Sequence, residues 1–126
     1  WAKLMGNISY GPLCILTRRN LRETYADPVV SAAAERMIRE AQAIAAGLGI
    51  TLDEDPVGKL SGVGRSAHKP SILQDLELGR QMEVEAIMLA PLRLARMAGV
   101  ETPTLDLVVA LAKSVAEGAG LYVPGE

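Results

Sequence analysis

Apolar residues recur along the 126-residue chain at the spacing of α-helices, and no segment alternates with period two for long enough to predict a strand. The predicted helices cover residues 2–17, 25–49, a short stretch from Asp55-Pro56, 71–100 and 102–120. The pattern therefore predicts an all-α domain of about five or more helices, without a convincing internal repeat.

The clearest of these helices follows Asp27, a favourable N-cap, and Pro28, a residue suited to the first helical position. One apolar stripe continues at 4-3-4-3-4 spacing through Val30, Ala34, Met37, Ala41, Ile44 and Leu48. Gly47 and Gly49 are expected to end this helix. Its wet face carries i,i+4 ion pairs at Glu35–Arg39 and Arg36–Glu40.

Prolines are expected to disturb two other helices. Gly11-Pro12 should kink or interrupt the first one, because a proline inside a helix removes a backbone hydrogen bond. Pro91 should bend the long 71–100 helix or split it in two. The first helix is otherwise apolar almost all round, which is typical of a buried helix.

Composition narrows the class of protein. Hydrophobic residues make up 49% of the chain, which argues against disorder, and the net charge of −2 gives no nucleic-acid footprint. The longest apolar runs are too short to cross a bilayer. Cys14 is the single cysteine, which excludes an internal disulfide framework and fits a reducing cytoplasm. With a single histidine as well, the chain is a poor candidate for zinc, and no Gly-rich phosphate loop occurs in it.

Two polar residues stand out in the first helix. Lys3 and Asn7 lie four residues apart and so share one helical face. A lysine in a buried helix must find a partner or reach water. Either Lys3 is exposed at a frayed helix start, or both residues line a cleft, with Lys3 as proton donor and Asn7 as an orienting amide.

The 71–100 helix holds two more candidates. Glu83 falls on its apolar stripe, four residues before Ile87, and either pairs with Arg80 at the surface or faces a pocket. Ser71 with Gln74 matches a capping box, and a helix N-terminus can also bind an anion.

Other polar residues near this helix have simpler interpretations. Asp75 is expected to pair with His68, Lys69 or a neighbouring helix, and His68 is interpreted as structural. Glu77 and Glu85 are interpreted as solvated.

Three blocks together resemble the C-terminal domain of the ketopantoate reductase (2-dehydropantoate 2-reductase) family. "WAKLMGNISYGPL" at 1–13 is similar to W-x-K-L-x-x-N-x-x-x-N-P-L, and "SILQDLELGRQMEVE" at 71–85 to S-M-L-Q-D-x-x-x-G-R-x-T-E-I-D. "AGVETPTLD" at 98–106 is similar to G-V-x-T-P-x-N. The order and spacing of the blocks match the family, and the resemblance covers essentially the whole chain.

The resemblance implies a helical domain of the 6-phosphogluconate dehydrogenase C-terminal-like type, preceded in family members by a Rossmann domain that binds NADPH. The chain begins at Trp1, already inside a periodic segment, and we interpret residues 1–126 as the helical substrate-binding and catalytic domain of a longer chain. The expected partners are then that Rossmann domain and a small 2-oxo acid. The resemblance also implies a role in pantothenate biosynthesis in the cytoplasm, and the apolar stripes leave a homodimer open.

The resemblance also implies roles for individual residues. Lys3 matches the catalytic lysine that donates a proton to the ketone oxygen as hydride arrives. Asn7 and Ser71 match substrate-binding residues, and Glu83 matches a glutamate that contacts the cofactor. Twelve residues of straight helix would separate Ser71 from Glu83 by about 18 Å, so we assign Ser71 to substrate and Glu83 to the cofactor side.

The chain departs from the family pattern at several positions. Gly11 stands where the family has a second substrate-binding asparagine, and Met82 stands where it has threonine. Met88-Leu89 replace an Asn-Gly pair, and the asparagine of the third block is missing. A different oxo or hydroxy acid substrate is therefore one alternative. A non-catalytic helical dimerisation module is another. The role of Asn20 and the choice between NADPH and NADH stay open.

Overall fold

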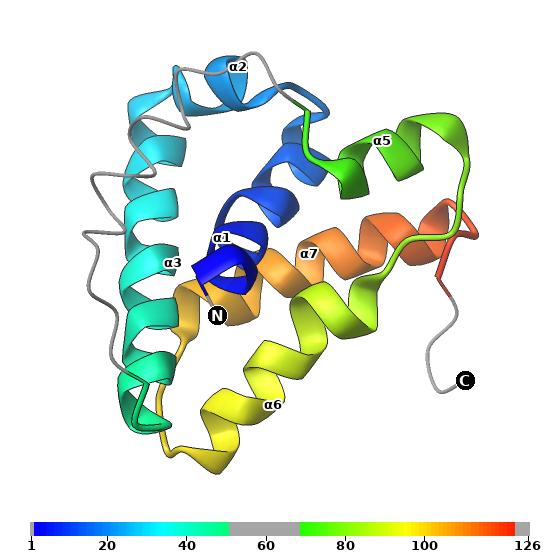
Figure 1. Ribbon diagram of the computed structural model, residues 1–126. Helices are drawn as coiled ribbons and strands as arrows, with labels where there is room; N and C mark the ends of the chain where they lie inside the picture. The colour runs from blue at the N-terminus through cyan, green and yellow to red at the C-terminus, as the bar shows by residue number, and fades with distance from the viewer. Residues whose placement is uncertain (1, 51–68, 123–126) are drawn as a thin grey trace.

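The computed structural model describes residues 2–50 and 69–122, and for residues 2–7 it describes the backbone alone. All the regular elements in these ranges are helices, which confirms the predicted fold class (Figure 1). Their bounds are α1 (Ala2–Thr17), α2 (Leu21–Tyr25), α3 (Pro28–Gly47), α5 (Ser71–Leu78), the π-helical η1 (Glu85–Leu89), α6 (Ala90–Met97) and α7 (Pro103–Gly118). The short helix expected from Asp55-Pro56, and His68, lie outside the described residues.

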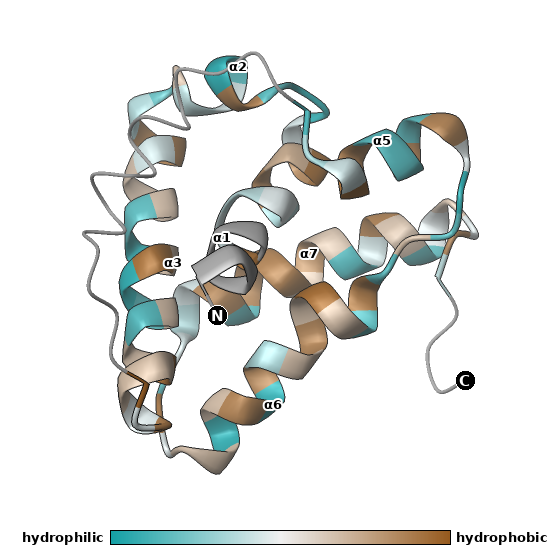
Figure 2. Cartoon of the chain, viewed as in Figure 1, coloured by the Kyte–Doolittle hydropathy of each residue, from teal (hydrophilic) through white to brown (hydrophobic). Residues whose placement is uncertain are grey.

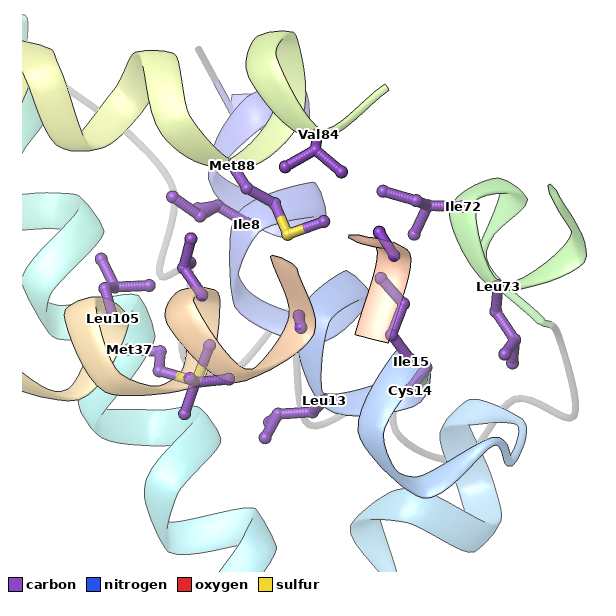
Figure 3. Packing of buried hydrophobic residues seen from close by; sticks show 14 of the residues in the cluster. Ile8, Leu13, Cys14, Ile15, Met37, Ile72, Leu73, Val84, Met88 and Leu105 are labelled. Atoms are coloured by element: carbon purple, nitrogen blue, oxygen red, sulfur yellow. The ribbon is translucent and has the colours of Figure 1, made fainter. Parts of the chain in front are cut away.

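Helix α1 is the centre of the fold. It packs against α2, α3, α5, η1 and α7 (Figure 1). Its residues Ile8, Cys14 and Ile15 are almost completely buried, in one cluster with Met88 of η1 and Leu73 of α5 (Figure 3). Hydrophilic and hydrophobic residues are mixed along α3 and α6 (Figure 2), and the buried ones include Met37 and Ile44 of α3 and Ala95 of α6.

Of the kink or interruption predicted for the first helix at Gly11-Pro12, the interruption is wrong, because α1 continues through Pro12 to Thr17. Pro12 has no N–H to donate to the preceding turn, which weakens the helix locally. Burial of Ile8 and Ile15 on either side of it holds both halves in register. Tertiary packing thus overrides the local preference.

Helix α3 is the element that the sequence predicts best. It begins at Pro28, and the Asp27 carboxylate accepts hydrogen bonds from the backbone N–H groups of Val29 and Val30 at 2.8 and 3.2 Å. The middle of the predicted stripe is buried, at Ala34, Met37, Ala41 and Ile44. The Glu35–Arg39 ion pair is present, with 2.9 Å between Oε1 and Nη2.

Glu40 of α3 has a role that the sequence did not indicate. Helix α7 begins at Pro103 with Thr102 as its N-cap, but the Thr102 hydroxyl donates to Asp106 instead of capping the helix. The Glu40 carboxylate accepts hydrogen bonds from the N–H groups of Thr104 and Leu105 at 3.1 and 2.8 Å. The carboxylate that the spacing paired with Arg36 therefore caps a helix 64 residues further along the chain.

Replacing Glu40 by alanine is expected to lower the free energy of unfolding by about 1–2 kcal/mol, because two N–H groups at the start of α7 lose their acceptor. Glu35→Ala is the matched control: it removes an exposed ion pair of the same helix and should change stability by less than about 0.5 kcal/mol. Urea denaturation followed by circular dichroism gives both values. Equal losses for the two variants would contradict the capping role.

The predicted long helix 71–100 is wrong in its middle. Helix α5 ends at Leu78, and Gly79 adopts the left-handed conformation with a φ of +68°. The Arg80 N–H donates to the carbonyl of Asp75, which completes a helix-ending motif that favours glycine at this position. Residues 79–83 form no helix, and the Met82 N–H donates to the carbonyl of Leu121 at 2.9 Å. The break thus occurs at Gly79 and not at Pro91.

Pro91 lies inside a continuous helix because the preceding turn is wider than an α-turn. The Ala90 N–H donates to the carbonyl of Glu85, five residues back, in the π-helical turn η1. Such a turn accommodates a residue that cannot make the usual i→i−4 bond.

Among the described residues, no helix combines the length and the apolar character that crossing a membrane needs.

Candidate active site

The first part of the candidate site is one face of α1. Positions 3, 7 and 11 follow one another at intervals of four residues within this helix and so share that face. Gly11 is the member of the series whose surroundings are described. It is buried, and a Cβ atom added there would lie 3.4 Å from Cγ2 of Ile72 in α5. The face that carries Lys3 and Asn7 therefore runs, at Gly11, into the first turn of α5.

Ser71 lies at the start of that same turn, next to Ile72, and is exposed. The predicted capping box is wrong: the N-cap is Pro70, whose carbonyl accepts the N–H groups of Leu73 and Gln74. The Gln74 side chain donates to the carbonyl of Lys69 at 2.8 Å instead of closing a box. Because Pro70 occupies the N-cap position, Ser71 is the first residue of α5, and its hydroxyl is not needed to cap the helix.

Glu83 lies in the non-helical segment 79–83 and is exposed. Its neighbours Met82 and Val84 are buried, at 2% and 0% exposure, so the backbone alternates and turns Glu83 away from the core. The Glu83 carbonyl accepts the N–H of Ile87, at the start of the next helix. The straight helix from which the 18 Å separation was derived does not exist: Ser71 begins α5, which packs on α1, whereas Glu83 lies in the segment between α5 and η1.

The charged residues around α5 pair differently from the sequence expectation. Arg80 does not serve Glu83: its Nε lies 3.2 Å from Oδ1 of Asp75. Lys69, one of the partners considered for Asp75, instead has its Nζ 3.0 Å from Oε2 of Glu77. Glu77 is exposed, as expected, although it takes part in this surface ion pair, and Glu83 is an exposed carboxylate at the break between α5 and η1.

Sequence analysis missed the contacts that hold the Glu83 segment. The Tyr122 hydroxyl donates to Oε1 of Glu85 at 2.8 Å, and the Arg93 guanidinium donates to Oε2 at 2.8 Å. With the bond from Met82 to Leu121, the end of the described chain is tied to both sides of Glu83. These contacts lower the pKa of Glu85, chiefly through Arg93, and the bond to Glu85 raises the pKa of Tyr122.

The lowered pKa of Glu85 predicts a pH dependence of stability. The folded protein releases this proton more readily than the unfolded chain, so the stabilisation is complete above the ordinary value of 4.5 and is lost as pH falls below it. Midpoints of thermal unfolding should therefore fall more steeply with acid in the wild type than in Glu85→Gln. Tyr122→Phe, which removes one of the two hydrogen bonds, should lie between them. Parallel curves for all three proteins would contradict the assignment.

Cys14 is not a nucleophile for this site. It is buried, and its Sγ lies 3.7 Å from the hydroxyl of Thr24 in α2. Burial raises the pKa of the Cys14 thiol, and it also raises the pKa values of Tyr10 and Tyr25 in the same region. A thiol that burial keeps protonated is inert, so we interpret Cys14, Tyr10 and Tyr25 as residues that pack α1 against α2.

A hollow of about 430 Å³ lies at the turn between α6 and α7, away from the predicted residues. Several of its polar groups bond to one another. Arg96 pairs with Asp106, which also accepts a hydrogen bond from the Thr102 hydroxyl at 2.9 Å. Arg96 donates in addition to the carbonyl of Val100. These bonds close the turn between two helices.

The comparisons with known proteins agree on one family. The family model described as "Ketopantoate reductase PanE/ApbA C terminal" matches residues 1–116. A 2-dehydropantoate 2-reductase of Mesorhizobium japonicum is 41% identical over 97% of this chain, and one of Mycobacterium tuberculosis is 31% identical over 95%. The crystal structure of 2-dehydropantoate 2-reductase from Methylococcus capsulatus superimposes with a TM-score of 0.86 at 28% identity, covering 100% of this chain and 41% of that one.

The helical fold of the described residues is thus shared with that solved reductase. The chain belongs to the ketopantoate reductase C-terminal domain family. It spans 38% and 41% of the lengths of the two curated relatives from Mesorhizobium japonicum and Mycobacterium tuberculosis.

Proposed function

We propose that this chain is the helical C-terminal domain of an NADPH-dependent reductase that converts ketopantoate, or a related 2-oxo acid, into the 2-hydroxy acid. The observation that carries the proposal is the junction of α1 and α5. The helix face bearing positions 3 and 7 continues to Gly11, and Gly11 meets the turn of α5 that starts with Ser71. Membership of the family supports the same assignment.

The proposed roles follow from the chemistry of carbonyl reduction. Hydride addition to C2 leaves negative charge on the ketone oxygen, and the Lys3 ammonium donates the proton that converts it into a hydroxyl. Asn7 and Ser71 bind and orient the 2-oxo acid. Glu83, exposed at the break before η1, lies on the cofactor side.

The nicotinamide cofactor supplies the hydride when it is bound. This chain has no Gly-rich phosphate loop, so the dinucleotide is expected to be held by a Rossmann domain of the same protein, and this chain contributes Glu83 beside it. An exposed carboxylate is suited to accept hydrogen bonds from a ribose or an amide. A homodimer stays a further prediction.

Gly11 supports a second candidate, a reductase of this family with another 2-oxo acid as substrate. The position is buried against Ile72 and presents no amide to a ligand, whereas the family pattern has asparagine there. The polar part of ketopantoate beyond its carboxylate and ketone would then lack one donor. A 2-oxo acid with an apolar substituent would not need it.

The test is oxidation of NADPH by the full-length protein with ketopantoate and with a panel of 2-oxo acids that carry aliphatic side chains. Turnover of ketopantoate supports the first candidate, and turnover of an aliphatic 2-oxo acid alone supports the second. A folded protein that binds NADPH, as its fluorescence shows, and reduces none of them would reject both. Repeating the assay with NADH settles the cofactor.

A further inference from the structure

Gly11 is an unusual residue for its place. It lies in the interior of a 16-residue helix, followed by Pro12, where glycine costs about 1 kcal/mol relative to alanine. What it gains is a close approach of α5. A Cβ at this position would lie in ordinary van der Waals contact with Cγ2 of Ile72 at 3.4 Å, so alanine fits, and a longer apolar side chain that extends towards α5 has to displace Ile72.

Ile72 cannot yield without moving the turn that contains it. Its side chain is 3% exposed, and the adjacent Leu73 is 0% exposed and belongs to the same core cluster (Figure 3). Interiors are packed closely enough that an inserted group shifts backbone rather than finding spare volume. Ser71 precedes Ile72 in the first turn of α5, so it moves with it.

We propose that Gly11 is a positioning residue for the substrate. By lacking a side chain it lets α5 pack directly against α1, and this contact sets the distance between the Ser71 hydroxyl and the α1 face that bears positions 3 and 7. The inference rests on the proposed function, in which Ser71 binds the 2-oxo acid. Binding geometries tolerate errors of only about 0.5 Å, so a small displacement of α5 weakens substrate binding.

The proposal predicts different effects on KM and kcat, because Ser71 binds the substrate whereas Lys3 donates the proton. Lys3 lies two helical turns before Gly11 on the same helix and does not depend on α5 for its backbone position. A displaced Ser71 should therefore raise KM while kcat changes little. Loss of a hydrogen bond to a charged substrate group corresponds to about a tenfold effect.

The experiment compares Gly11→Ala with Gly11→Leu in the full-length protein, using the 2-oxo acid that the wild type reduces. Both replacements are good helix formers, so helix propensity is matched. Gly11→Ala should keep KM within about twofold, and Gly11→Leu should raise it about tenfold or more with kcat within about threefold. Adding Ile72→Ala to Gly11→Leu removes the group in the way and should recover most of the lost affinity.

A double-mutant cycle of Gly11→Leu and Ser71→Ala tests whether the increase in KM depends on Ser71. Ser71→Ala alone should raise KM, and Gly11→Leu added to it should raise KM no further, since the residue through which it acts is gone. Independent, multiplying effects would overturn the proposal, as would an unchanged KM in Gly11→Leu.

Folding is measured alongside. A Gly11→Leu protein with a reduced folded fraction loses kcat and not KM, and that pattern would also overturn the proposal. If Gly11→Leu does not fold at all, Gly11→Val and its Ile72→Ala partner carry the same comparison. A wild type that reduces no 2-oxo acid would reject the proposed function, and the role of Gly11 with it; normal turnover with insensitive variants rejects the role of Gly11 alone.

Discussion

Replacing Lys3 by alanine in the full-length protein is expected to lower kcat for 2-oxo acid reduction by about 10²–10⁴-fold, the usual contribution of a positioned proton donor. The reason is the negative charge that hydride addition places on the ketone oxygen, which water stabilises far less well than an adjacent ammonium group. Oxidation of NADPH at saturating substrate measures the loss. KM should change much less than kcat, because Asn7 and Ser71 are still present.

Two controls separate proton donation from loss of structure. Lys113→Ala removes a lysine of α7 whose Nζ lies 3.6 Å from Glu117, and it should leave kcat unchanged. Small primary amines added to the Lys3→Ala protein should restore part of the rate by supplying the missing ammonium. A Lys3→Ala variant with near-normal kcat would show that Lys3 is an exposed residue at the start of α1 and that another group donates the proton.

The elements predicted correctly from the sequence are those specified by local signals. Helix α3 has the expected carboxylate cap and the expected proline at its first position, and the middle of its apolar stripe is buried. The start of α7 at Pro103 was also predicted from its proline, although its N–H groups are capped by Glu40 of α3. Helix α2 was missed because it is only five residues long and is opened by Asn20, whose side chain accepts the Glu23 N–H at 2.8 Å. The cap signal was there, but the apolar pattern is too short to reveal it.

The break after α5 shows where pattern reasoning fails. Gly79 ends α5 within the single helix predicted over 71–100, although apolar residues continue at helical spacing on both sides of it. Contacts with residues far along the chain hold the segment after Gly79 in a non-helical conformation: the Met82 N–H donates to the carbonyl of Leu121, and the Tyr122 hydroxyl donates to the Glu85 carboxylate. Neither partner can be identified from spacing, because each pair is separated by more than thirty residues.

The candidate site divides in the same way. Lys3, Asn7 and Glu83 were selected because polar groups at otherwise apolar positions need an explanation, and Ser71 because it matched a helix cap; the family resemblance gave each a role. The sequence placed Ser71 and Glu83 on one straight helix, whereas in the structure Ser71 begins α5 and Glu83 lies in the non-helical segment before η1. The contact of Gly11 with Ile72 could not be predicted, because an absent side chain leaves no periodic signal.

The largest loss of stability is expected from Leu73→Ala, at about 2–5 kcal/mol. Leu73 is 0% exposed and joins the first turn of α5 to the cluster around Ile15 of α1 (Figure 3). Truncation removes the transfer free energy of the buried atoms and leaves a cavity that neighbouring side chains fill incompletely. Leu78→Ala is the matched control, since it changes the same residue type in the same helix at 66% exposure, and it should cost less than about 0.5 kcal/mol.

Chemical denaturation followed by far-UV circular dichroism measures both variants. The comparison bears on the site as well as on the core, because the turn that Leu73 anchors begins with Ser71. If that turn is held mainly by Leu73 and Ile72, Leu73→Ala should raise KM for the 2-oxo acid at temperatures where the protein is still folded, whereas Leu78→Ala should not. Equal stability of the two variants would mean that α5 is not fixed to α1 by this packing, and Gly11 would then have no rigid element through which to position Ser71.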